Sequence, residues 1–146
     1  MASLHDLLAA PAHRPTVLVE CATLIDQEVA DKGGLSGLAI KGGYKLVKSF
    51  KPGFVPDAVD GMLDDFCRNL QPLVDEAHQK NHAVGAFFGQ HRSRVADALL
   101  AITDRRAQRS KLAGIKSAYE KLRGMAKKNV EDAVPRLAAL VEKHGG

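Results

Sequence analysis

The sequence has few of the residues that favour β-strands. Its 146 residues include no Trp, two Tyr, five Phe, four Ile and three Thr. The apolar content comes mainly from 21 Ala and 17 Leu, which favour helices. This composition predicts an all-α protein.

Cysteine is equally scarce, and long apolar runs are absent. Cys21 and Cys67 are the two cysteines, and both lie in apolar stretches far apart in the sequence. They are predicted to be buried free thiols of an intracellular protein rather than the bridge of a secreted one. No stretch approaches the ~20 apolar residues of a membrane span, and the N-terminus lacks the cationic start and apolar run of a signal peptide. We therefore expect a cytoplasmic location.

The length of the chain suits one hydrophobic core. Surface scaling predicts that folding buries roughly two thirds of the accessible surface, which is enough for one domain and too little for two. Apolar residues also recur with helical period along most of the chain. We expect residues 1–146 to form a single helical domain, a compact multi-helix bundle of six to eight helices without a sheet.

Capping residues and prolines indicate where several helices begin and end. Ser3 and Asp6 have the spacing of a capping box, and Ser93 is a candidate cap for a later helix. In the last third, Asn129 is a candidate internal cap, and Pro135 removes a helix hydrogen bond. This pattern predicts segments at about 114–128 and 130–143, either separate or joined at a kink.

Charge is unevenly distributed although the net charge is only +4. Residues 32–51 carry +5 and residues 80–128 carry +9, whereas residues 52–79 between them carry −5. Two interpretations stay open. Either the basic blocks converge on one face, or the acidic helix, which contains Asp57, Asp60, Asp64 and Asp65, packs beside them and partly cancels their field.

The basic blocks contain the candidate binding residues. In the first block, lysines occupy one side of a helix and Ala39, Gly43, Leu46, Val47 and Phe50 the other, a pattern typical both of core helices and of helices on anionic membranes. Within the second block, the stretch 105–128 could contact phosphates, but Tyr119 is its one aromatic residue, and the carboxylates of Asp104 directly before it and of Glu120 within it interrupt the positive charge. The predicted contacts are Lys41, Lys45, Lys48, Arg105, Arg106 and Arg109.

No set of residues predicts catalysis. Asp75, His78 and His82 share a helical face, but histidines near a helix C-terminus are usually exposed without a metal. The glycines between positions 33 and 43 lack the Lys-Ser/Thr of a phosphate loop, and they are better explained by a helix start and a close helix approach. We expect no catalytic residue, no cofactor and no metal.

Three stretches of the chain resemble a known family: DKGGLSGLAIKGGYKLVKSFKPGFVPDAVDGML, VADALLAITDRRAQRS and KKNVEDAVPRLAALVEKH. They are similar to those of uncharacterised, all-helical bacterial proteins of about this length. The resemblance implies a stand-alone helical protein, and it implies no activity, cofactor or site residue.

The favoured hypothesis is a non-catalytic cytoplasmic interaction module with a basic surface and an unknown protein partner. One alternative is a ligand-binding bundle or an enzyme with a pocket between helices, lined by Phe66, Phe87, Phe88 and Tyr119. Another is peripheral binding to an anionic membrane or to nucleic acid.

Overall fold

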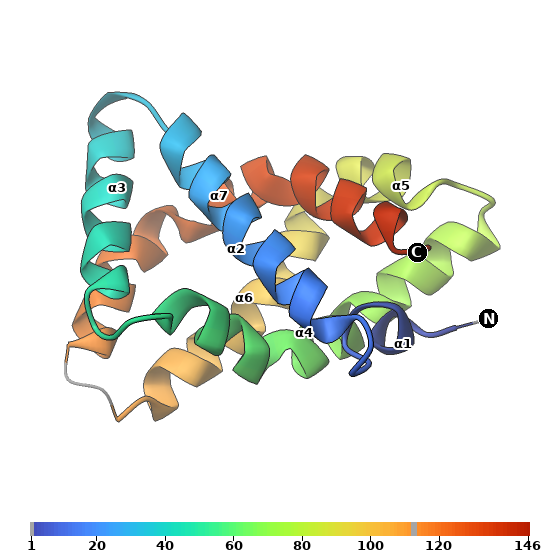
Figure 1. The fold of residues 1–146 in the computed structure, drawn as a ribbon. Coiled ribbons are helices and arrows are strands. Elements are labelled where there is room, and N and C mark those ends of the chain that lie inside the picture. Colours follow the sequence, from blue (N-terminus) through green and yellow to red (C-terminus); the bar gives the residue numbers. More distant parts are fainter. Residues whose placement is uncertain (1, 112–113) are drawn as a thin grey trace.

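Seven helices make up the fold in the computed structural model, which describes residues 2–111 and 114–146 (Figure 1). They are α1 (Leu4–Leu8), α2 (Arg14–Asp31), α3 (Gly34–Lys48), α4 (Phe54–Gln79), α5 (Val84–Gln90), α6 (Arg92–Arg109) and α7 (Ile115–Lys143). These described ranges contain no strand, and the helices account for 83% of the described residues. The prediction of a compact all-α bundle of six to eight helices without a sheet is confirmed.

The main hydrophobic core lies between α4, α5, α6 and the second half of α7, with α1 and α2 covering one side. Its largest wholly buried side chains are Phe87, Phe88, Leu4, Val17, Val95, Val134, Val141 and Cys67. No residue of α3 belongs to this cluster. Figure 1 shows α3 standing at one end of the bundle, across the direction of α2 and of the second half of α7. The helix that carries three of the predicted lysines is therefore peripheral to the core.

The first helix begins as its capping signal predicts. The Ser3 hydroxyl accepts a hydrogen bond from the Asp6 amide at 3.1 Å, and the Asp6 carboxylate accepts one from the Ser3 amide at 3.1 Å. The prediction that Ser93 caps a helix is wrong, because α6 begins at Arg92 and its N-cap, His91, makes no side-chain capping bond. Ser93 is therefore an exposed residue of the first turn.

The last third of the chain is one helix, α7, in which Pro135 is an interior residue. Asn129 does not cap a second segment, because its amide donates a hydrogen bond to the Met125 carbonyl at 2.7 Å, one turn earlier. Figure 1 shows that the axis of α7 changes direction between its first and second halves. The sequence left open whether two separate helices or two joined segments form this region, and the structure shows that the segments are joined.

Glycine allows α3 and α7 to approach closely. A Cβ atom at Gly43 would lie 2.6 Å from Cδ2 of Leu122, closer than side chains pack. Gly33 caps α3 and Gly34 follows with a φ of 70°, a backbone conformation that glycine adopts without strain. Gly33 and Gly34 therefore have the predicted role of a helix start, and Gly43 has that of a close approach.

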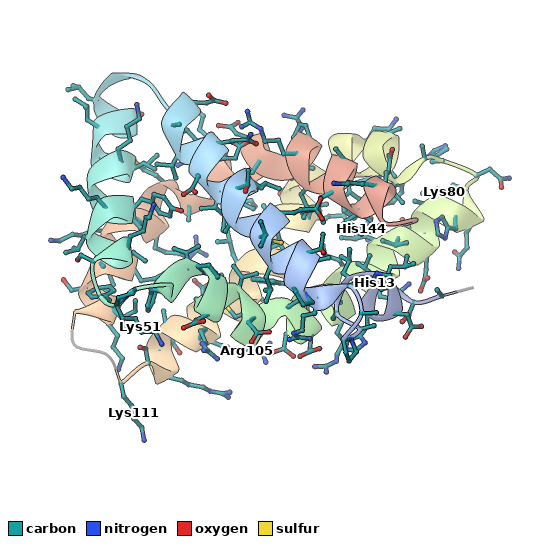
Figure 2. The ribbon with its side chains drawn as sticks, viewed as in Figure 1. His13, Lys51, Lys80, Arg105, Lys111 and His144 are labelled. Atoms are coloured by element: carbon teal, nitrogen blue, oxygen red, sulfur yellow. The ribbon has the colours of Figure 1, made fainter. Side chains whose placement is uncertain are left out.

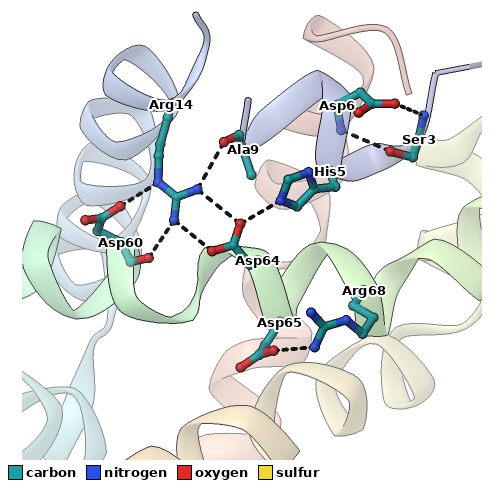
Figure 3. Close-up of polar contacts among 9 residues, drawn as sticks. All are labelled: Ser3, His5, Asp6, Ala9, Arg14, Asp60, Asp64, Asp65 and Arg68. Atoms are coloured by element: carbon teal, nitrogen blue, oxygen red, sulfur yellow. Dashed lines mark hydrogen bonds and ion pairs between the residues drawn. The ribbon is translucent and has the colours of Figure 1, made fainter. Parts of the chain in front are cut away.

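An arginine joins the start of α2 to α4, and Figure 3 shows its contacts. Arg14 Nε donates to Asp60 Oδ1 at 2.6 Å, and Nη2 donates to the Asp60 carbonyl at 2.9 Å. Nη1 and Nη2 each donate to an Asp64 carboxylate oxygen at 3.1 Å, and Nη1 also donates to the Ala9 carbonyl at 3.0 Å. His5 Nε2 lies 2.7 Å from Asp64 Oδ1. All five N–H groups of this guanidinium are therefore hydrogen-bonded.

Candidate binding site in a groove between α4 and α6

The structure brings Arg105, Arg106 and Arg109 together at the end of α6. They line a surface groove of about 480 Å³ against the first half of α4, here called the α4–α6 groove. Its other charged lining residues are Lys51, Asp57, Asp65 and Lys111. Figure 2 shows Lys51, Arg105 and Lys111 on the same lower part of the molecule, with Lys111 extending into solvent.

The groove has an apolar floor. Ile102 and Ala107 of α6 are buried there, and Phe54, Met62 and Ile115 line the space around them. A surface that combines an apolar floor with a cationic rim suits a ligand that carries apolar groups beside negative charge.

Arg106 rests directly on α4 at Gly61. A Cβ atom at Gly61 would lie 2.6 Å from Nη2 of Arg106 and 2.9 Å from its Cζ. Any other residue at this position would push the guanidinium away, so the small size of Gly61 gives Arg106 its place in the groove. The contact is with the surface of the helix and not with a carboxylate.

The carboxylates of α4 are paired with other cations. Asp60 and Asp64 bind Arg14, and Asp65 forms an ion pair with Arg68 at 2.7 Å on the same helix. Asp57 forms an ion pair with Lys51 at 3.4 Å. The negative charge that the sequence places beside the basic blocks is thus directed mainly to residues outside the arginine cluster.

The three arginines of the groove have no such partner. Within residues 2–111 and 114–146, no acidic side chain forms an ion pair or a hydrogen bond with Arg105, Arg106 or Arg109, and Lys111 has none either. The side chains of all four are exposed. Their charges are therefore available to a ligand.

The lysines of α3 lie outside the α4–α6 groove. Lys48 is 3.6 Å from Asp26 and lies over the Tyr44 ring, 5.2 Å from its centroid. Lys41 and Lys45 are exposed, and no described acidic side chain pairs with them. The six predicted contacts therefore divide into an arginine cluster and a separate set on α3.

Lys51 and Lys111 line the groove but were not among the predicted contacts. Each lies just outside a helix, Lys51 before α4 and Lys111 after α6. In the sequence, the one indication of their position is that both lie between helices, Lys51 directly before Pro52-Gly53 and Lys111 directly after Ser110. The ends of α4 and α6 meet in the fold, which brings these two breaks together.

A second, larger groove of about 830 Å³ lies between α2, α3 and α7. Lys32 pairs there with Glu28 at 3.5 Å and with Asp132 at 3.3 Å. Arg136 pairs with Glu28 at 2.7 Å and with Asp31 at 2.5 Å. Since these charges satisfy one another, this groove is the weaker candidate for a charged ligand.

The four aromatic residues predicted to line an inter-helix pocket do not line either groove. Phe87 and Phe88 are wholly buried in the core, and Phe66 is half-buried on α4. The Tyr119 hydroxyl lies 2.9 Å from the Thr103 hydroxyl and donates to Asp104, to which Arg123 also donates at 2.8 Å. Burial first, and then the Asp104 carboxylate, raise the pKa of Tyr119 to about 12. Tyr119 is thus part of a structural network at neutral pH.

Neither cysteine is an activated nucleophile. Cys67 is 1% exposed, and burial raises the pKa of its thiol to about 12. Cys21 is only half-buried, contrary to the expectation of full burial, and desolvation raises the pKa of its thiol to about 11. Both thiols are therefore protonated at neutral pH.

In the part of the chain that the structure describes, no three His, Cys, Asp or Glu side chains are grouped so as to hold a metal ion, and Asp75 instead accepts a hydrogen bond from Gln71 at 2.8 Å. No described helix combines the length and the apolar character needed to cross a membrane.

The sequence was compared with known families and proteins. The model of a family of unknown function, DUF6918, matches residues 4–145. The chain belongs to this family. No curated protein and no solved structure matches it. Membership of DUF6918 therefore supplies no function, and any functional proposal depends on the geometry described above.

Proposed function

We propose that the protein is a non-catalytic cytoplasmic interaction module whose residues 1–146 act as one domain. In this proposal, the α4–α6 groove binds an acidic segment of a partner protein. Arg105, Arg106 and Arg109 supply the main contacts, with Lys51 and Lys111 at the rim.

One observation carries the proposal. Arg105, Arg106 and Arg109 have no described acidic partner, although the neighbouring helix α4 has four aspartates between positions 57 and 65. Arginine forms bidentate hydrogen bonds with carboxylates and is common at interfaces. Three adjacent unpaired arginines around an apolar floor match an acidic segment that also carries apolar side chains.

A protein segment fits this groove better than a nucleic acid does. Because the carboxylates of Asp57 and Asp65 also line the groove, anions can approach it only near the arginines, which suits a segment with a few spaced carboxylates better than a continuous row of phosphates. The buried floor at Ile102 and Ala107 offers contact area to apolar side chains, which a phosphate backbone does not use. An acidic segment with interspersed leucines would use both features.

The groups in the groove favour binding over proton transfer. Arginine stays protonated near neutral pH, and Asp57 and Asp65 are each engaged by a cation. Guanidinium groups and ion-paired carboxylates therefore act in this proposal as charged contacts for a ligand.

The test is a titration with a designed peptide. The probe is a fluorescein-labelled helical peptide with Glu on one face and Leu on the other. A second peptide, with Gln in place of every Glu, is the control. We expect the acidic peptide to bind and the Gln peptide to bind at least about tenfold more weakly, a difference of about 1.4 kcal/mol.

Two triple variants with the same net charge locate the site. Arg105→Ala/Arg106→Ala/Arg109→Ala should weaken binding of the acidic peptide at least about tenfold. Arg92→Ala/Lys116→Ala/Lys121→Ala removes three exposed cations outside the groove and should change the affinity less than about threefold. Equal losses in the two variants would show that net charge alone attracts the peptide and would contradict the proposal.

A further inference from the structure

The outer side of α3 is apolar and uncovered. Leu35 is 87% exposed, Leu38 is 67% exposed and Leu46 is 43% exposed. A helix turns about 100° per residue, so these three leucines share one side of α3. Figure 1 places α3 along one end of the bundle, where a whole side of the helix faces outward.

A different side of α3 packs against the protein. Ile40 is buried, Gly43 lies against Leu122 of α7, and the Tyr44 hydroxyl donates to Asp26 of α2. The pattern in the sequence grouped Ala39 and Leu46 with Gly43 on one apolar side, but in the structure both are exposed. Helix α3 therefore has two apolar sides, and the fold uses only one.

Cations lie beside the uncovered leucines. Lys41 and Lys45 follow Leu38 by three and seven residues, which places them next to it on adjacent turns. Both are exposed without a described acidic partner, and α3 contains no Asp or Glu.

The end of the molecule that α3 occupies has an excess of basic residues, although Asp26 pairs there with Lys48, and Glu28 and Asp132 pair with Lys32. Residues 32–57 have five Lys and one Asp, and residues 101–128 have nine Lys or Arg and two Asp or Glu. Together these ranges carry +11 and the rest of the chain −7. A second copy would present the same positive charge to this helix, so charge opposes pairing of α3 with itself.

We propose that α3 docks the protein on an anionic membrane surface. The helix would lie parallel to the membrane, with Leu35, Leu38 and Leu46 at the boundary of the acyl chains and Lys41 and Lys45 among the headgroups. Interfacial helices have this combination of an apolar side and flanking lysines. None of these three leucines lines either described groove, and a convex helix side suits a flat lipid surface better than a protein anchor, which needs a pocket.

The absence of Trp from the sequence gives a direct test. Leu38→Trp introduces a single fluorophore on the outer side of α3, and Val19→Trp introduces one at an equally exposed position, 67%, on α2. The vesicles contain phosphatidylcholine with about 30% phosphatidylglycerol, because an anionic surface is required. We expect a blue shift and quenching by brominated lipid for Leu38→Trp, and neither change for Val19→Trp.

Further variants and controls separate the contribution of the leucines from that of the lysines, and a lipid surface from a soluble phosphate. Adding Leu35→Ser/Leu46→Ser to Leu38→Trp should lower the bound fraction at least about tenfold, and Lys41→Gln/Lys45→Gln should weaken binding most at low salt. Vesicles of phosphatidylcholine alone should bind poorly, and soluble glycerol phosphate should not compete. Circular dichroism checks that each variant is folded.

Several results would overturn the proposal. They are a lack of vesicle binding, equal signals from Leu38→Trp and Val19→Trp, and full competition by glycerol phosphate. A dimer in sedimentation velocity that Leu35→Ser/Leu38→Ser dissociates would assign the leucines to a second copy instead. Since the peptide assay uses the α4–α6 groove and this assay uses α3, failure of one proposal is distinguishable from failure of the other.

Discussion

Arg14 and Arg106 both rest on α4, at consecutive residues, but their surroundings are opposite. Arg14 meets Asp60 and directs all five N–H groups to oxygen atoms, as Figure 3 shows. Arg106 meets Gly61 and has no acidic partner among the described residues. One arginine thus joins α2 to α4, and the other lines an open groove.

The difference shows how one acidic helix can lie beside a basic cluster without neutralising it. The four aspartates in the first half of α4 point along several directions around the helix, and each is engaged by a cation that is not Arg105, Arg106 or Arg109. Sequence proximity of opposite charges therefore does not measure their pairing. The predictions below test whether Arg14 stabilises the fold while Arg106 serves binding.

The largest expected effect on stability is that of Arg14→Ala. It removes five hydrogen bonds and leaves Asp60 and Asp64 without their main cation, so we expect a loss of about 2 kcal/mol in the free energy of unfolding. Arg106→Ala removes no hydrogen bond and should cost less than about 0.5 kcal/mol. Urea denaturation of both variants measures the two values. Equal losses would contradict the division of roles.

The rate of thiol labelling should also show that Arg14, and not Arg106, stabilises the contact between α2 and α4. Cys67 is buried near Arg14, so its reaction with a thiol reagent requires opening of the structure. Arg14→Ala should speed the labelling of Cys67 about thirtyfold, because the expected loss is about 2 kcal/mol and each 1.4 kcal/mol of lost opening energy is a factor of ten. Arg106→Ala should leave the rate unchanged. Half-buried Cys21 should react before Cys67 in the wild type.

The effect of acid on stability should be smaller in Arg14→Ala. Hydrogen bonds from Arg14 and then His5 hold the pKa of Asp64 below its ordinary value of 3.8. A lowered pKa in the folded state means that ionised Asp64 stabilises the fold above that value, and that this contribution is lost as the pH falls below it. Urea denaturation at pH 6 and pH 3 should therefore show a smaller drop for Arg14→Ala than for wild type. Arg106→Ala should follow the wild type.

The smallest expected effect is that of the triple arginine variant on binding to duplex DNA. The protein should bind DNA weakly through its basic residues at low salt. This binding should disappear near physiological ionic strength, where charges are screened beyond about 8 Å. The Arg105→Ala/Arg106→Ala/Arg109→Ala variant should change this weak binding little. Tight binding at physiological salt that this variant loses would show that the groove acts on nucleic acid.

Much of the fold was predictable because helices follow local signals. The scarcity of β-formers indicated the all-α class, and the Ser3–Asp6 spacing located the first cap. Where tertiary contacts compete with a local signal, the prediction failed. Asn129 has the side chain of a cap, but α7 continues through it and its amide bonds to Met125.

The candidate site was predictable in part. Arg105, Arg106 and Arg109 fall within five residues at a helix end, so their grouping is local. Whether their charges stay unpaired depends on Arg14, which reaches α4 from 46 residues away in sequence. The addition of Lys51 and Lys111 likewise depends on the meeting of two helix ends. The sequence left open whether the apolar side of α3 faces the core or a membrane, because a helix with two apolar sides has no unique inner face in sequence.

Mapping of the bound peptide by two-dimensional NMR tests the central claim most directly. The labelled 15.7 kDa protein is titrated with the acidic Glu/Leu peptide, and backbone amide shifts are followed. We expect the large shifts on residues that line the α4–α6 groove, around Phe54–Asp65 and Ile102–Lys111. Large shifts confined to the α2–α3–α7 groove, or spread evenly over all basic residues, would contradict the assignment of the groove as the binding site.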